Sequence, residues 1–230
     1  MTNFGPSDWD GLRLVVFDVD GTLYSQRPLR LRMARDLLLH AIVRLDFATL
    51  SMLRTYRHKR EEMGDAQVED FDARLVAETA AATGRSPEQV RAVVSQWIDR
   101  HPLPYLRACR YAGLGELFTG LRRHGKTIGV LSDYPAVAKL AALELAADYV
   151  VTADDPGIGI LKPHPRGLET VIRQAGATPS TTLLIGDRAE RDGLAARAAG
   201  TRVLLRASQP IDGWQTFARY DEALFAPMLA

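Results

Sequence analysis

The stretch LRLVVFDVDGTL spans residues 12–23 and places Asp18 and Asp20 directly after a run of apolar residues. A near-continuous apolar run is typical of a strand that is buried on both faces of a parallel sheet. Positions i and i+2 of an extended chain point to the same side, so the two carboxylates are expected to lie close together. Their repulsion favours a divalent cation with oxygen ligands, and Gly21 allows a tight turn after the pair.

Four further runs have the length and apolar composition of buried strands, and helical patterns separate them. This alternation predicts an α/β fold, a doubly wound parallel sheet that binds ligands beyond the carboxyl ends of its strands. The predicted strands are 12–17, 127–131, 148–152, 182–185 and 201–205. The predicted helices are 114–124, 136–146, 165–175 and 188–199, with Gly125, Gly176 and Gly200 as left-handed C-caps after three of them.

Residues 27–107 show no strand pattern and predict about four helices instead. Ser86-Pro87-Glu88-Gln89 is a typical helix start, because serine is a good N-cap and proline suits the first helical position. The helices are expected at 29–45, 47–63, 68–83 and 87–100, with breaks at Gly64-Asp65 and Gly84-Arg85. The chain therefore predicts a core of residues 1–26 and 108–230 and an all-helical insert of residues 27–107.

Polar residues also follow other predicted strands, where a parallel sheet would bring them to one edge. Each has a simple local explanation when taken alone: Ser-Asp often caps a helix, and a lysine is usually solvated. Local caps do not explain why serine, lysine and aspartate gather at successive strand ends of one chain. The residues concerned are Ser132, Asp133, Lys162, Gly186, Asp187 and Asp192.

The ordered set of these residues, starting with Asp18-Val19-Asp20-Gly21-Thr22-Leu23, resembles the four motifs of the haloacid dehalogenase-like hydrolases. The resemblance covers about residues 14–205. A lone Asp-x-Asp is a weak motif, but the complete set on alternating strands is specific. The insert between the first two motifs resembles the family's helical cap of the first type, as in phosphoglycolate phosphatase-like members.

The resemblance implies a role for each matching position. Asp18 would attack phosphorus and form an aspartyl-phosphate, and Asp20 would protonate the leaving oxygen and then activate water. Mg²⁺ would be held by the Asp18 carboxylate, the Asp20 backbone carbonyl and Asp187. The substrate phosphate would be bound by Ser132, Asp133 and Lys162, and the supporting residues would be Gly21, Thr22, Gly186 and Asp192.

The family contains several activities, and the residues favour a phosphatase. Dehalogenases typically lack an acid at the position of Asp20, because halide leaves without a proton. A phosphonatase needs a lysine in the cap, where Lys59 is the only one. A mutase of the β-phosphoglucomutase type shares every core motif and stays an alternative, as does a non-catalytic phosphate-binding or scaffold protein on the same fold.

Composition limits the partners. The net charge of +1 favours no nucleic acid, and no stretch approaches the ~20 apolar residues of a membrane span. Residues 27–60 carry nine basic and two acidic residues, which suits either a solvated helix pair or steering of an anionic substrate. We expect a cytoplasmic enzyme that acts on a small phosphate ester, without stable membrane association, and its oligomeric state is left open.

Overall fold

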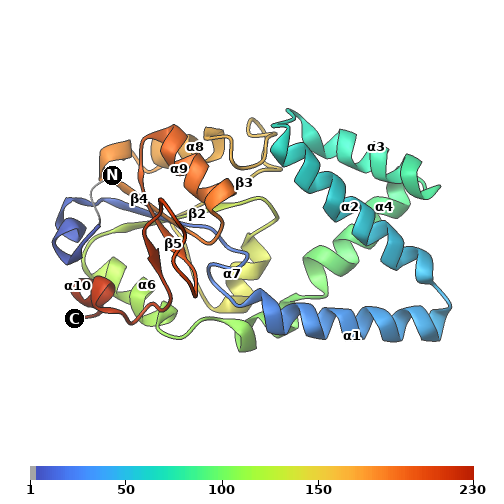
Figure 1. The fold of residues 1–230 in the computed structure, drawn as a ribbon, viewed down its shortest axis with the longest axis horizontal. Coiled ribbons are helices and arrows are strands. Elements are labelled where there is room, and N and C mark those ends of the chain that lie inside the picture. The colour runs from blue at the N-terminus through green and yellow to red at the C-terminus, as the bar shows by residue number, and fades with distance from the viewer. Residues whose placement is uncertain (1–3) are drawn as a thin grey trace.

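Six parallel strands form one sheet in the order β3-β2-β1-β4-β5-β6 in the computed structural model, which describes residues 4–230 (Figure 1). The chain builds outward from β1 through β2 to β3 and then returns to the other side of β1. The switch point, where ligands bind in such sheets, therefore lies between β1 and β4. The strands are β1 (Leu14–Phe17), β2 (Thr127–Ser132), β3 (Tyr149–Thr152), β4 (Thr182–Gly186), β5 (Arg202–Arg206) and β6 (Thr216–Phe217).

Helices cover both faces of the sheet, with α8 and α9 on one face and α6 and α10 on the other (Figure 1). Successive side chains of β1 point to opposite faces of the sheet. Val15 and Phe17 pack in the larger apolar cluster, whereas Leu14 and Val16 pack in the second one. The core helices are α6 (Leu114–Arg123), α7 (Val137–Leu143), α8 (Arg166–Gln174), α9 (Leu194–Ala199) and α10 (Ala226–Leu229).

The predicted α/β core is confirmed, with one strand missing from the prediction. All five predicted strands form, and Gly125, Gly176 and Gly200 have the expected positive φ angles of 67°, 60° and 71°. The sixth strand, β6, was not predicted because it has only two residues and pairs at the edge of the sheet. The helix predicted at 188–199 begins instead as a π-helical turn over Ala189–Gly193.

The chain between β1 and β2 is helical, apart from its connecting turns and the isolated bridges that Tyr24 forms with Asp20 and Arg110. Ser86 caps α4 as predicted, because its hydroxyl accepts from the Gln89 N–H while the Gln89 side chain accepts from the Ser86 N–H. The predicted break at Gly64-Asp65 is wrong, since α2 continues through Gly64 to Asp65. The helices are α1 (Gln26–Arg44), α2 (Phe47–Asp65), α3 (Phe71–Thr83), α4 (Pro87–Val94), a π-helical segment Ser95–Arg100 and α5 (Leu103–Leu106).

This helical block lies beside the sheet, with α1 and α2 reaching away from it (Figure 1). The exact division into a core of 1–26 and 108–230 and a cap of 27–107 stays a prediction. Within residues 4–230, no helix combines the length and the apolar character that crossing a bilayer requires.

Gly120 allows the C-terminal helix to dock, and this contact yields a prediction. A Cβ at Gly120 would overlap the carbonyl oxygen of Met228 in α10. We expect Gly120→Ala to lower the free energy of unfolding by about 1–3 kcal/mol, measured by urea denaturation. Gly115→Ala in the same helix is the matched control, because the nearest atom would lie 3.7 Å away. Equal stability of the two variants would contradict the account.

Candidate active site

Asp18 follows β1 at the centre of the sheet and is almost fully buried. Its Oδ2 accepts a hydrogen bond from the Thr22 hydroxyl at 3.0 Å, within the turn that follows the strand. Its Oδ1 accepts from the Lys162 ammonium at 2.5 Å. The Asp18 carboxylate is therefore held from two directions at the switch point of the sheet.

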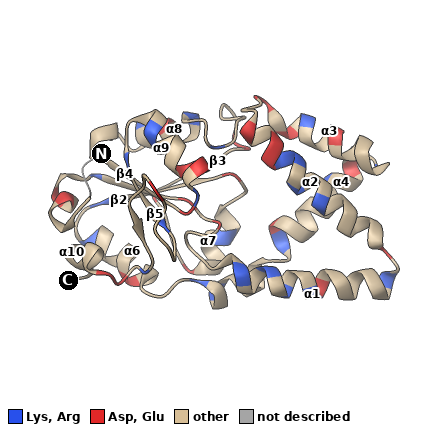
Figure 2. Cartoon of the chain, viewed as in Figure 1, with Lys and Arg blue, Asp and Glu red and all other residues tan. Residues whose placement is uncertain are grey.

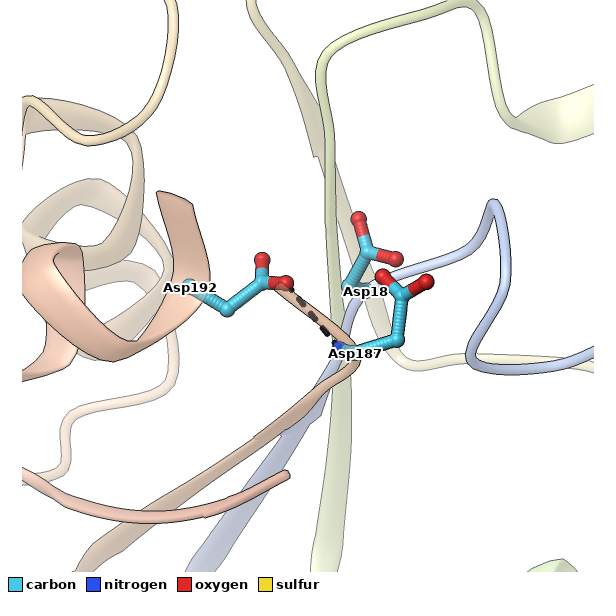
Figure 3. A group of neighbouring side chains, drawn as sticks. All are labelled: Asp18, Asp187 and Asp192. Carbon is cyan, nitrogen blue, oxygen red and sulfur yellow. Dashed lines mark hydrogen bonds between the residues drawn. The ribbon is translucent and has the colours of Figure 1, made fainter. Parts of the chain in front are cut away.

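Asp187 and Asp192 join Asp18 from the neighbouring strand end. Asp187 directly follows β4, and Asp192 lies in the π-helical turn after it. The three side chains lie close together (Figure 3), and each carboxylate offers one oxygen within 4.8 Å of the others. Oδ2 of Asp192 accepts from the backbone N–H groups of Asp187 and Arg188 at 3.1 and 3.0 Å, which fixes the turn.

Two glycines make room for this cluster. A Cβ at Gly21 would overlap the Asp187 carboxylate, and the φ of Gly21 is +102°, a conformation that other residues rarely adopt. A Cβ at Gly186 would overlap the side chain of Asp192. The predicted supporting role of both glycines thus has a steric basis in the structure.

Lys162 is the only cation that bonds directly to this group of carboxylates among the described residues. Its ammonium donates to Asp18 and, at 2.6 Å, to Asp192, and it is buried. The backbone around it is also anchored. Asp133 accepts from the Lys162 N–H at 3.0 Å, and the Arg191 guanidinium donates to the Lys162 carbonyl at 2.9 Å.

Three carboxylates around one ammonium leave an excess of negative charge. Burial raises the pKa of Asp18 above its ordinary value, and the Asp192 charge adds to this while Lys162 opposes it. Burial likewise raises the pKa of Asp187, with Asp18 and Asp192 contributing. Asp187 Oδ1 is also buried and has no hydrogen-bond partner within residues 4–230. Oxygen ligands, excess negative charge and an unpartnered carboxylate oxygen all fit a hard divalent cation.

Asp20 is paired with a lysine that the sequence analysis missed. The Lys139 ammonium, from α7, lies 2.7 Å from both carboxylate oxygens of Asp20 and is buried. Burial alone would raise the pKa of Asp20, but the Lys139 charge and hydrogen bonds outweigh it and lower the pKa. The Tyr24 hydroxyl also donates to Asp20, and the Asp20 backbone carbonyl accepts from the Gln26 side chain at 2.6 Å.

Ser132 ends β2 beside these groups. It is buried, and its Oγ accepts from the Tyr134 N–H at 3.2 Å. The Asp133 side chain is directed to the Lys162 backbone, so it anchors the segment that carries the lysine.

Arg60, from α2, connects the helical block to the site. Its buried guanidinium lies between the rings of Phe71 and Tyr134, at 4.8 and 4.3 Å from their centroids, and donates to the Asp133 carbonyl. A second contact is made by Glu61, which accepts two hydrogen bonds from Arg188 at 2.9 and 3.0 Å. These contacts fix one end of α2 over the strand ends.

A cavity of about 1220 Å³ lies between the carboxylates and the helical block. Asp18, Asp20 and Asp187 line one end, and apolar side chains of α1 such as Leu29 and Met33 line another part. Part of the basic segment also faces this cavity: Arg27, Arg30, Arg57 and Arg60. Lys59 does not, since it pairs with Glu78 at 3.0 Å.

Comparison with known proteins identifies the family. The model for haloacid dehalogenase-like hydrolases matches residues 12–200, which include every residue of the cluster. The chain belongs to the haloacid dehalogenase-like hydrolases.

Relatives within this family include named phosphatases. The chain is 27% identical over 196 residues to a glyceraldehyde 3-phosphate phosphatase of Methanopyrus kandleri, covering 82% of this chain and 81% of the relative. It is 26% identical to phosphoglycolate phosphatase 1 of Pseudomonas aeruginosa, covering 83% and 67%. The crystal structure of 2-haloacid dehalogenase from Pseudomonas syringae pv. Tomato superposes with a TM-score of 0.64 at 18% identity, covering 95% and 98%, which shows the shared fold.

The structure gathers the predicted residues of this hydrolase at one edge of the sheet. Lys162 contacts Asp18 and Asp192, and these two carboxylates and that of Asp187 lie within 4.8 Å of one another. Asp20 lines the same cavity. The catalytic, phosphate-binding and metal-binding roles of these residues stay predictions. Lys139, Arg60, Tyr24 and Gln26 were missed as site residues; of these, only Arg60 gave a signal, as part of the basic segment.

The raised carboxyl pKa values predict how stability depends on pH. The pKa is about 7 for Asp18 and about 8 for Asp187, against 3.8 ordinarily. At a pH between the ordinary pKa and the raised pKa, the folded protein keeps protons that the unfolded chain has released. The free energy of unfolding therefore falls as the pH rises. Without metal, we expect urea unfolding to show a loss on the order of 1 kcal/mol or more from pH 5 to pH 8.

Asp187→Asn provides the control for this pH dependence. Removing one titrating carboxyl group should flatten the decline in stability between pH 5 and pH 8. Adding Mg²⁺ to the unaltered protein should stabilise it more at pH 8 than at pH 5, because ligands must be deprotonated. Stability that rises with pH across this range would show that the cluster is not protonated as described.

Proposed function

We propose that the chain is a Mg²⁺-dependent phosphomonoester hydrolase in which Asp18 forms an aspartyl-phosphate. The observation that carries the proposal is the cluster of Asp18, Asp187 and Asp192 around Lys162, at the end of a cavity large enough for a metabolite. The named phosphatase relatives support a phosphate ester as substrate.

Asp18 is suited to act as the nucleophile because its carboxylate is held in place before substrate binds. Thr22 and Lys162 fix its two oxygens, so one defined face is presented to the cavity. Lys162 would also contact the transferring phosphoryl group, since its ammonium lies beside the attacking carboxylate. Ser132 and the backbone that follows β2 would bind the phosphoryl oxygens from the other side.

Asp18, Asp187 and the Asp20 carbonyl would hold Mg²⁺, with Asp192 fixing the turn behind them. The cation would screen the anionic nucleophile from the anionic substrate. The Asp187 carboxylate would gain most from the cation, because its buried Oδ1 has no hydrogen-bond partner in the described part of the chain. Gly21 and Gly186 support the site by leaving room for the two carboxylates.

Asp20 would donate a proton to the leaving-group oxygen in the first step and accept a proton from water in the second. In the structure Lys139 holds Asp20 as a carboxylate, which is the form that accepts a proton from water in the second step. To act as an acid in the first step, Asp20 must gain a proton once the substrate's negative charge is bound beside it. The helical block of 27–107 would act as the cap that excludes water from this exchange.

Removing the nucleophile tests the proposal directly. Asp18→Asn keeps the size of the side chain, and we expect it to lower kcat for p-nitrophenyl phosphate by at least about 10³-fold. EDTA should abolish turnover by the unaltered enzyme, and Mg²⁺ should restore it. Asp10→Asn, at an exposed position, is the matched control and should retain full activity. Activity without metal, or in Asp18→Asn, would refute the proposed function.

The role of Asp20 predicts a dependence on the leaving group. Asp20→Ala should slow an alkyl phosphate by about 10²-fold or more, because an alkoxide needs a proton in order to leave. The same variant should slow p-nitrophenyl phosphate much less, because p-nitrophenolate is a stable anion. Steady-state kcat/KM for both substrates measures the difference, and equal losses would mean that Asp20 is not the acid.

A further inference from the structure

The outer face of α1 and the turn from α1 into α2 carry a large exposed apolar surface. Seven large apolar residues between positions 31 and 47 are more than half exposed to solvent. Among residues 4–230, only Val137 and Leu194 are further exposed large apolar residues. The seven, defined as the α1 patch, are Leu31, Leu38, Leu39, Ile42, Val43, Leu45 and Phe47.

The spacing within the patch suits packing against another helix. Leu31, Arg35, Leu38 and Ile42 of α1 follow one another at intervals of four and three residues, and Leu45, the C-cap of the helix, comes three residues later. This is the spacing of the contact line between two helices in a coiled coil. The opposite side of α1 is already used within the chain, since Leu29, Met33 and Ala41 are buried.

The charges of α1 lie mostly away from the patch. Arg27 and Arg30 line the active-site cavity, and Arg32 lies over the Tyr105 ring at 5.7 Å. Only Arg35 interrupts the contact line, and Asp36 pairs with it at 2.9 Å. Figure 2 shows few charged residues along the second half of α1. A helix that binds an anionic lipid surface places its cations around the apolar face, so this arrangement favours an apolar protein partner.

The area of the patch matches what a dimer interface requires. Seven such side chains offer on the order of 700 Å² of apolar surface, more than the ~300–600 Å² of the largest patch on a typical monomer. A standard interface buries roughly 800 Å² on each partner. In a two-fold symmetric dimer both copies contribute the same surface, so two α1 patches can cover each other without a further partner.

We propose that the α1 patch is the interface of a two-fold symmetric homodimer. The contact line of one α1 packs against the contact line of the α1 in the second copy, with Leu39, Val43 and Phe47 flanking it. Leu38 also lines the active-site cavity, as does Ala34 beside it. The partner helix would therefore cover the outer part of that cavity.

Sedimentation velocity at micromolar protein concentration tests this interface. The unaltered chain is expected to sediment as a dimer. The double variant Leu38→Glu/Ile42→Glu should sediment as a monomer, because four carboxylates would meet across the axis. Both positions are exposed in one copy, so the variant should fold and keep the far-ultraviolet circular dichroism of the unaltered chain.

Val137→Glu is the matched control, because this exposed apolar residue lies on α7 outside the patch. It should leave the dimer intact. If the unaltered chain is a monomer at micromolar concentration, the proposal is wrong. This holds even if the chain pellets with phosphatidylserine vesicles, because the patch would then bind lipid and not a second copy. A double variant that still sediments as a dimer would overturn it as well, since the interface would then lie elsewhere.

Discussion

Three carboxylates meet at the switch point of the sheet, and one ammonium group bonds to two of them. Asp18, Asp187 and Asp192 repel one another, and Lys162 offsets only part of that charge. Such a cluster is unfavourable in a protein core unless something compensates for it. Fixed hydrogen bonds and the Lys162 ammonium compensate for part of this charge, and the proposed cation would compensate for the rest.

The helical block also makes hydrogen bonds that hold the site residues in place. Arg191 is a core residue that donates to the Lys162 carbonyl, and it also binds the Glu61 carbonyl and the Asp65 carboxylate of α2. Gly64 leaves room for this guanidinium, because a Cβ there would overlap it. The segment that carries the lysine is thus tied to both parts of the chain, so movement of α2 and the environment of Lys162 are linked.

The sequence predicted those parts of the site that stand at the ends of apolar strands. Asp18, Ser132 and Asp187 each follow such a run, and parallel strands bring their carboxyl ends to one edge. Lys139 was not predictable in this way, because a lysine in a helix usually reaches solvent and only the tertiary fold buries it against Asp20. Arg60 was counted within a basic segment, but its position between two aromatic rings depends on Phe71 of α3 and on Tyr134, which lies 74 residues after Arg60 along the chain.

The most direct test of the carboxylate cluster is anomalous diffraction at the manganese edge from crystals grown with Mn²⁺ in place of Mg²⁺. The account predicts one strong peak between Asp18 and Asp187, within bonding distance of the Asp187 oxygen that has no other partner. An empty map at this position in crystals that contain manganese, or a peak only at another place, would contradict the claim that this charge cluster is built to hold a cation.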